Sequence, residues 1–160
     1  MPPPLREPIG LQLTRTSRAV TRAFDARLAE AGGTLPVWLV LLNVTTRQAT
    51  NQRELAEAVG IQGATLTHHL NGMEAAGLLT RRRDPANRRV HLVELTDQGR
   101  ELFHRLRAAA VGHDERIRSA FTGEELARLG ELLDRMRAAV GAPVEGRPAL
   151  GRGAATLVDT

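Results

Sequence analysis

The order of patterns between residues 51 and 95 constrains the fold of this chain more than any other feature. Asn51, followed three residues later by Glu54, resembles an N-terminal capping box, and Gly60 ends the short helix that it opens. A second helix is expected from Gln62 to Ala76, with apolar residues at the spacing of one buried side. Two short strand-forming runs then flank a polar turn, which predicts a β-hairpin. Helix, turn, helix and hairpin in this order predict a winged helix-turn-helix.

Long helices are predicted on both sides of this region. The first begins near Gly10, and a second, nearly all apolar helix follows from about Pro36. Thr96 is a cap residue for a long fifth helix, and the pair Thr122 and Glu125 predicts a capping box for a last helix. The apolar residues of that last helix step by three and four, as in an interhelical seam: Leu126, Leu129, Leu133, Met136 and Val140.

The fold class expected is mainly α with a small β-hairpin wing, in which a winged helix-turn-helix is embedded between long dimerisation helices. We expect an irregular N-terminal segment at 1–9, dimerisation and core helices at 10–46 and a winged helix-turn-helix DNA-binding lobe at 47–96. C-terminal dimerisation helices are expected at 97–140 and a flexible tail at 141–160.

The distribution of charge favours DNA as the partner of the lobe. The chain has 22 Lys and Arg residues, all of them Arg, and a net charge of +4. The hairpin segment RRRDPANRR alone holds five arginines against one aspartate, while the second helix of the lobe has no charged residue from Gln62 to Met73. An ordinary solvated helix would be richer in charged side chains, so a surface that accepts phosphates is favoured over a simple solvated face.

Composition disfavours several other functions. The chain has no Cys, no Tyr and only two Ser, and it shows no glycine-rich phosphate loop, so an enzyme is not expected. A winged helix that binds protein instead of DNA stays an alternative, but it has no use for so many arginines on one hairpin. No apolar run approaches the ~20 residues of a membrane span, so a cytoplasmic protein is expected. No motif in the sequence indicates a cofactor, and none is expected.

The stretch GATLTHHLNGMEAAGLLTRRRDPANRRVHLVELTDQGRELF resembles the signature of MarR-type transcriptional regulators. The resemblance covers about residues 10–140 and is sharpest from Asn51 to Phe103. It implies a homodimer that places two recognition helices on pseudo-palindromic double-stranded DNA and represses a promoter by blocking it.

The DNA contacts expected combine the uncharged helix face with the arginines of the wing. They are Gln62, Thr65, Thr67, His68, Asn71, Arg81, Arg83, Arg88 and Arg89. The resemblance makes Thr65, Thr67 and His68 the readers of bases and phosphates. Asn71 and Asn87 stand where relatives usually have Asp, so a neutral amide would have to orient the wing arginines, and a less fixed wing is predicted.

The resemblance also implies a small aromatic or carboxylate effector bound between the dimer helices and the lobe. Its candidate contacts are Arg15, Arg18, Trp38, His69, His91 and His113. The arginines could instead form surface ion pairs, Trp38 could be a core residue, and His69 a core histidine bonded to a backbone carbonyl. Zinc sensing stays an alternative, although no pair of histidines has the spacing of a helical metal site.

Overall fold

The computed structural model describes residues 7–46, 51–87 and 90–141. Within these ranges the chain forms six helices and a two-stranded antiparallel sheet. In chain order the elements are α1 (Ile9–Glu30), α2 (Leu35–Thr45), α3 (Gln52–Val59), α4 (Gly63–Ala75), β1 (Leu79–Arg83), β2 (His91–Leu95), α5 (Asp97–Arg118) and α6 (Gly123–Ala139). The predicted mainly helical fold with a hairpin wing is confirmed.

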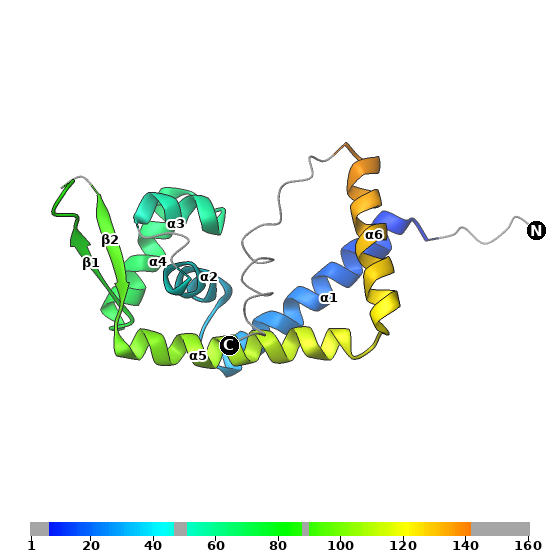
Figure 1. Ribbon diagram of the computed structural model, residues 1–160, viewed down its shortest axis with the longest axis horizontal. Coiled ribbons are helices and arrows are strands. Elements are labelled where there is room, and N and C mark those ends of the chain that lie inside the picture. Colours follow the sequence, from blue (N-terminus) through cyan, green and yellow to red (C-terminus); the bar gives the residue numbers. More distant parts are fainter. Residues whose placement is uncertain (1–6, 47–50, 88–89, 142–160) are drawn as a thin grey trace, which may run out of the picture.

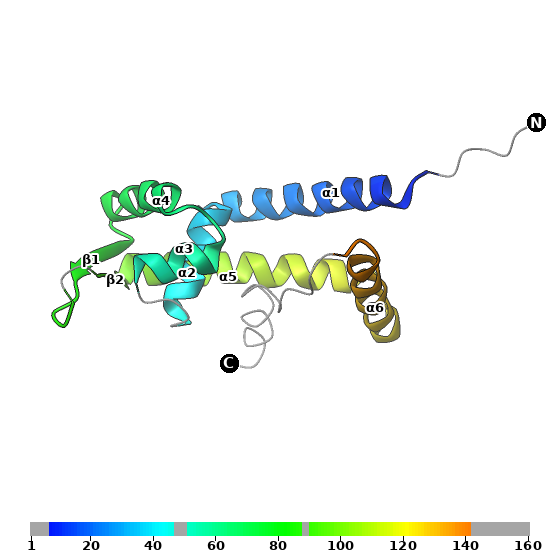
Figure 2. The same ribbon diagram turned by 90° about the horizontal axis from the view of Figure 1, so that it is seen from above.

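The long helix α5 connects two differently built ends of the molecule. At one end, α2, α3, α4 and the hairpin gather around the start of α5 (Figure 1). At the other end lie α6 and the N-terminal part of α1 (Figure 2). The recognition helix expected from the sequence is α4, which lies beside the hairpin in the first of these groups.

The helix boundaries follow the local signals in the sequence. Asn51 Oδ1 accepts a hydrogen bond from the backbone N–H of Glu54 at 3.0 Å, as a helix N-cap does. Gly60 adopts a left-handed φ of 74° after α3, where a side chain would be strained. Thr96 caps α5, and Thr122 with Glu125 forms the predicted capping box at the start of α6.

The two strands of the hairpin pair with each other, and one further bridge joins the hairpin to the start of α3. Leu79 pairs with Leu95 at its base and Arg83 with His91 toward its tip. An isolated bridge between Asn51 and Leu92 joins β2 to the residue that caps α3. The wing is therefore positioned by the backbone of the helix-turn-helix.

The core lies under the hairpin and between α2, α4 and α5. Its fully buried or nearly buried side chains are Leu28, Trp38, Val40, Leu41, Leu42, Leu55, Leu66, Leu70, Met73, Leu79, Val93, Leu102, Phe103 and Leu106. Helix α2 supplies four of them, which confirms it as the central buried helix. We call residues 34–96 the lobe. The core of the lobe is completed by Leu28 of α1 and by residues from the first three turns of α5.

A close backbone contact joins the lobe to α5. The Thr96 hydroxyl donates to the Gly77 carbonyl at 2.6 Å, so the cap of α5 also holds the end of α4. At Gly99, an added Cβ would come within 1.9 Å of the Leu78 carbonyl oxygen. Only glycine allows α5 to start so close to the wing.

The N-terminal part of α1 and the region around α6 are largely exposed among the residues that the structure describes. We call residues 9–23 and 111–140 the arm. In the ranges 7–46, 51–87 and 90–141, all the exposed large hydrophobic residues lie in the arm: Ile9, Leu11, Leu13, Val20, Phe121, Leu129, Leu132 and Val140. Helix α6 has no buried residue.

Candidate nucleic-acid interface

Helix α4 buries one side in the core and presents the other to solvent. Leu66, Leu70 and Met73 are buried. The predicted contact residues Gln62, Thr65, His68 and Asn71 are all exposed. The solvent face is therefore polar and carries no carboxylate before Glu74.

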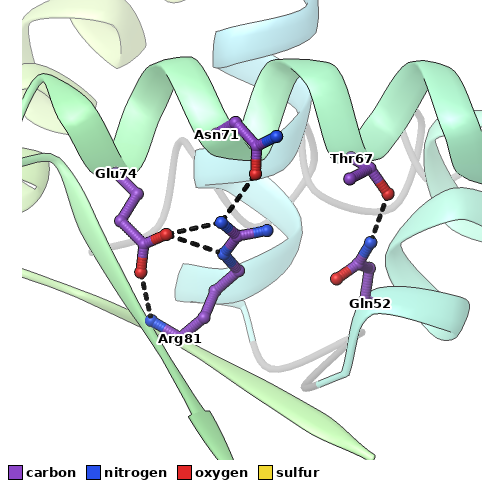
Figure 3. Close-up of polar contacts among 5 residues, drawn as sticks. All are labelled: Gln52, Thr67, Asn71, Glu74 and Arg81. Carbon is purple, nitrogen blue, oxygen red and sulfur yellow. Dashed lines mark hydrogen bonds and ion pairs between the residues drawn. The ribbon is translucent and has the colours of Figure 1, made fainter.

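Thr67 lies at the junction of α3 and α4 and is half-buried, not on the open face. Its hydroxyl accepts a hydrogen bond from Gln52 Nε2 at 2.6 Å and donates one to the Gly63 carbonyl at 2.9 Å (Figure 3). With both bonds made, the hydroxyl fixes α4 against the first turn of α3. The hydroxyl of Thr67 therefore has a structural role in the packing of these two helices.

A polar cluster fixes the wing to α4. Arg81 Nη2 donates to Asn71 Oδ1 at 2.7 Å and to Glu74 Oε2 at 2.5 Å (Figure 3). Arg81 Nε donates to the same Glu74 oxygen at 3.0 Å, and the Arg81 backbone N–H donates to Glu74 Oε1 at 3.2 Å. We call Asn71, Glu74 and Arg81 the clamp.

The clamp orients Arg81 with an amide and a carboxylate together. Asn71 orients Arg81 through a neutral amide, as predicted. The amide does not act alone, because the carboxylate of Glu74, one turn further along α4, pairs with the same arginine. The hydrogen bond from the Arg81 side chain lowers the pKa of Glu74, against the opposing effect of its partial burial.

Glu94 neutralises a second arginine of the wing. Arg82 Nη2 lies 2.6 Å from Glu94 Oε1, and both side chains are about half exposed. The hydrogen bond between them raises the pKa of Arg82 and lowers that of Glu94. The register offered a signal for this pair: Arg82 is paired with Leu92, so Glu94 is its diagonal neighbour on the same strand face.

Among the wing arginines that the structure describes, Arg83 is the one that stays available. It is exposed, and within the part of the chain that the structure describes it has no ion pair. Arg88 and Arg89 lie outside the described residues. The basic charge of the hairpin is thus divided between structural arginines, Arg81 and Arg82, and at least one free arginine.

The candidate effector residues are not brought together into one site. Trp38 is 2% exposed and stacks on Phe103 with 5.7 Å between ring centres, as a core residue does. His69 is half-buried and lines a shallow surface cavity with Val37 and Met73. His91 lines a different cavity, at the start of α3.

The other candidates lie on or beside the arm. Arg15 makes a surface ion pair with Glu7 at 2.5 Å, and Arg18 is exposed on α1. His113 packs against Phe24 with 5.1 Å between ring centres, and its buried Nε2 has no hydrogen-bond partner among the described residues. In the same ranges, no three His, Asp or Glu side chains gather where they could hold a metal ion.

No single helix in the described ranges is long and apolar enough to cross a membrane. Helices α1 and α2 pass that test only as a pair bent by 74°.

Comparison with known proteins agrees with this architecture. The MarR family model matches residues 34–91. The HTH-type transcriptional regulator YdgJ of Bacillus subtilis strain 168 is 36% identical over 87 residues, covering 54% of this chain and 53% of the relative. The match thus spans about half the length of this curated relative.

Two solved structures extend the likeness over most of the chain. The transcriptional repressor CouR, bound to a 23-mer DNA duplex, is 28% identical with a TM-score of 0.70, covering 81% of this chain and 92% of that one. The PcaV regulator of Streptomyces coelicolor, in complex with its natural ligand, is 25% identical with a TM-score of 0.67, covering 82% and 92%.

Proposed function

The winged-helix region of this chain is a MarR-family domain, and from this premise we propose that the protein is a homodimeric, sequence-specific repressor that binds double-stranded DNA. MarR-family transcriptional regulators are DNA-binding regulators and not enzymes. The observation that carries the proposal is the acid-free, exposed face of α4 beside a wing that presents Arg83. A helix of this kind enters the major groove, while the wing contacts phosphates and the adjacent minor groove.

The uncovered arm supports the homodimer. Exposed apolar residues on α1 and α6 would be unusual on a monomer of this size, and a second copy offers the same surface in return. Two α4 helices would then enter successive major grooves about 10 base pairs apart. Binding in this way blocks access to a promoter, which is the mode of repression that we propose, and a regulator of this kind works in the cytoplasm.

We propose in addition that a small aromatic or carboxylate effector releases the dimer from DNA. PcaV, solved with its natural ligand, supports an effector in a protein of this fold. In this chain, the contact between α1 and α5 offers a buried, unpartnered polar atom, His113 Nε2, beside the ring of Phe24. A thermal-shift series with phenolic acids and with zinc tests the proposal. Stabilisation by a phenolic acid, lost in His113→Ala, is expected, and stabilisation by zinc alone would contradict it.

DNA binding is tested with the full-length chain and a random duplex library. We expect enrichment of a two-fold symmetric site and a steep fall of affinity with salt, with a slope of about 0.9 for each phosphate contacted. Arg83→Ala should lower that slope by about one per wing, whereas Arg82→Ala removes an arginine already paired with Glu94 and should lower it less. Failure to enrich any duplex would contradict the proposal and would favour a protein-binding winged helix.

A further inference from the structure

Asn71 combines an exposed position on α4 with a fixed orientation of its amide. It follows His68 by one helical turn, so both side chains belong to the solvent face of the helix. Asn71 Oδ1 accepts the hydrogen bond from Arg81 at 2.7 Å. A guanidinium has donors only, so the amide atom that faces it must be the oxygen. The amide nitrogen therefore points away from Arg81, as Figure 3 shows, and no described residue accepts a hydrogen bond from it.

The side chain of Arg81 is fixed by its contacts with Glu74. Its side chain is 18% exposed, and Glu74 accepts hydrogen bonds from its Nε, its Nη2 and its backbone nitrogen. Those contacts fix the guanidinium at the edge of β1. The Asn71 amide therefore has a stationary partner that determines which of its two polar atoms is turned outward.

This orientation changes what the side chain can recognise on DNA. Asparagine usually pairs with adenine through both atoms, accepting from N6 and donating to N7. Here the guanidinium takes one lone pair of the oxygen. Its positive charge and its own N–H groups would then face the amino group of adenine, which is also a donor, so adenine is disfavoured. The amide nitrogen still offers two donors, and guanine presents two acceptors, N7 and O6, on its major-groove edge.

We propose that Asn71 is a specificity-determining residue that donates to guanine, and that Arg81 is the positioning residue that excludes adenine. The proposal rests on the proposed function, since it assigns a base preference to the α4 face. The clamp has one arginine and one glutamate, so it is neutral in sum and does not repel the DNA. An aspartate at position 71 would accept a hydrogen bond instead of donating one.

Two substitutions at position 71 test the preference, with the full-length protein and selection from a random duplex library. In Asn71→Ala, the preference for guanine at one position of each half-site should fall by about tenfold, while other positions keep theirs. In Asn71→Asp, a carboxylate oxygen can still accept from Arg81, but the outward atom becomes an acceptor. That variant should select cytosine at the same position, because cytosine presents its N4 amino group there.

Substitutions in the rest of the clamp test the positioning role. Arg81→Met frees the amide to turn, so adenine should be accepted beside guanine at that position. Because Arg81→Met removes an arginine that is largely buried, Glu74→Gln serves as a second variant that loosens Arg81 without removing it, and it should broaden the preference in the same direction. Continued exclusion of adenine by both variants would overturn the role of Arg81.

Different results would contradict the proposed function and the assignment of Asn71. A wild-type chain that enriches no duplex contradicts the proposed function. A wild-type chain that enriches a site, together with position 71 variants that select the identical site, contradicts the assignment of Asn71 alone.

Discussion

The lobe and the arm use similar helices but differ in what covers their apolar sides. In the lobe, Leu66 and Leu70 of α4 are fully buried in the core. In the arm, Leu129 and Leu132 of α6 are 39% and 41% exposed, and α6 buries no residue. The apolar side of the lobe helices is therefore covered within one chain, whereas the described residues leave an apolar surface of the arm exposed.

This difference separates two kinds of stability in the same protein. Burial of a leucine contributes to folding only where the chain itself supplies the covering atoms. The lobe should therefore fold by its own core, while the arm should gain its stability from association and should depend on protein concentration.

The largest effect is expected from a substitution that disrupts the exposed apolar surface of the arm and leaves the lobe unchanged. Leu129→Arg places a charge on the exposed apolar side of α6. The proposed dimer should therefore dissociate, as sedimentation velocity would show. Loss of simultaneous binding to two half-sites should weaken operator binding by about 10²–10⁴-fold, measured by fluorescence anisotropy.

The matched control is Glu131→Arg, on the opposite side of α6. Glu131 makes a surface ion pair with Arg128 at 2.9 Å, and such exposed pairs contribute little, so this variant should stay dimeric. A Leu129→Arg protein that sediments as a dimer and binds the operator normally would show that α6 is not an interface.

A second test addresses the point where the two regions meet. Gly99→Ala would place a Cβ within 1.9 Å of the Leu78 carbonyl, so α5 must shift away from the wing. Overpacking of this kind costs about 1–3 kcal/mol of unfolding free energy, measurable by urea denaturation.

Gly112→Ala is the control in the same helix, at a position inside the arm. Nothing lies within 4 Å of an added Cβ there, so alanine should increase the unfolding free energy by up to about 1 kcal/mol. Equal effects of the two substitutions would mean that the junction at Gly99 is not tight.

The smallest effect is expected on thermal stability at low pH, and it should come from the clamp in the lobe. The pKa of Glu74 is lowered by Arg81, so the clamp stabilises the fold above the ordinary carboxyl pKa of 4.5 and loses this contribution as the pH falls below it. Between about pH 6 and pH 3, the thermal midpoint should therefore fall less in Glu74→Gln than in the wild type. Parallel curves for the two proteins would contradict a stabilising role of the ionised clamp.

Local patterns predicted the helix boundaries and the buried side of α4. The caps Asn51, Thr96 and Thr122 each bond to a backbone group three residues away, so the sequence contains both partners at a fixed spacing. The same holds for the buried leucines of α4, whose helical spacing alone puts them on one side. The winged helix-turn-helix followed from these elements taken in order.

The polar contacts of the interface were predicted less well. The sequence placed Thr67 on the open face, but the crossing of α3 and α4 brings its hydroxyl to Gln52. It indicated five available arginines on the hairpin, while the structure pairs Arg81 and Arg82 with glutamates seven and twelve residues away. The sequence analysis grouped the candidate effector residues into one pocket, but the structure places them on separate surfaces. Their positions depend on how α1 and α5 pack, which the spacing of residues does not show.

By itself, the sequence determined the elements of this protein, their order, and the concentration of basic charge on one hairpin. These properties depend on neighbours within about one helical turn or one strand pairing, where backbone geometry fixes the distances. Only the tertiary structure decided which arginines are free and which atom of Asn71 is turned outward. Those outcomes depend on the angle between α4 and β1, which is set by the packing of the whole core and is not written in the spacing of any two residues.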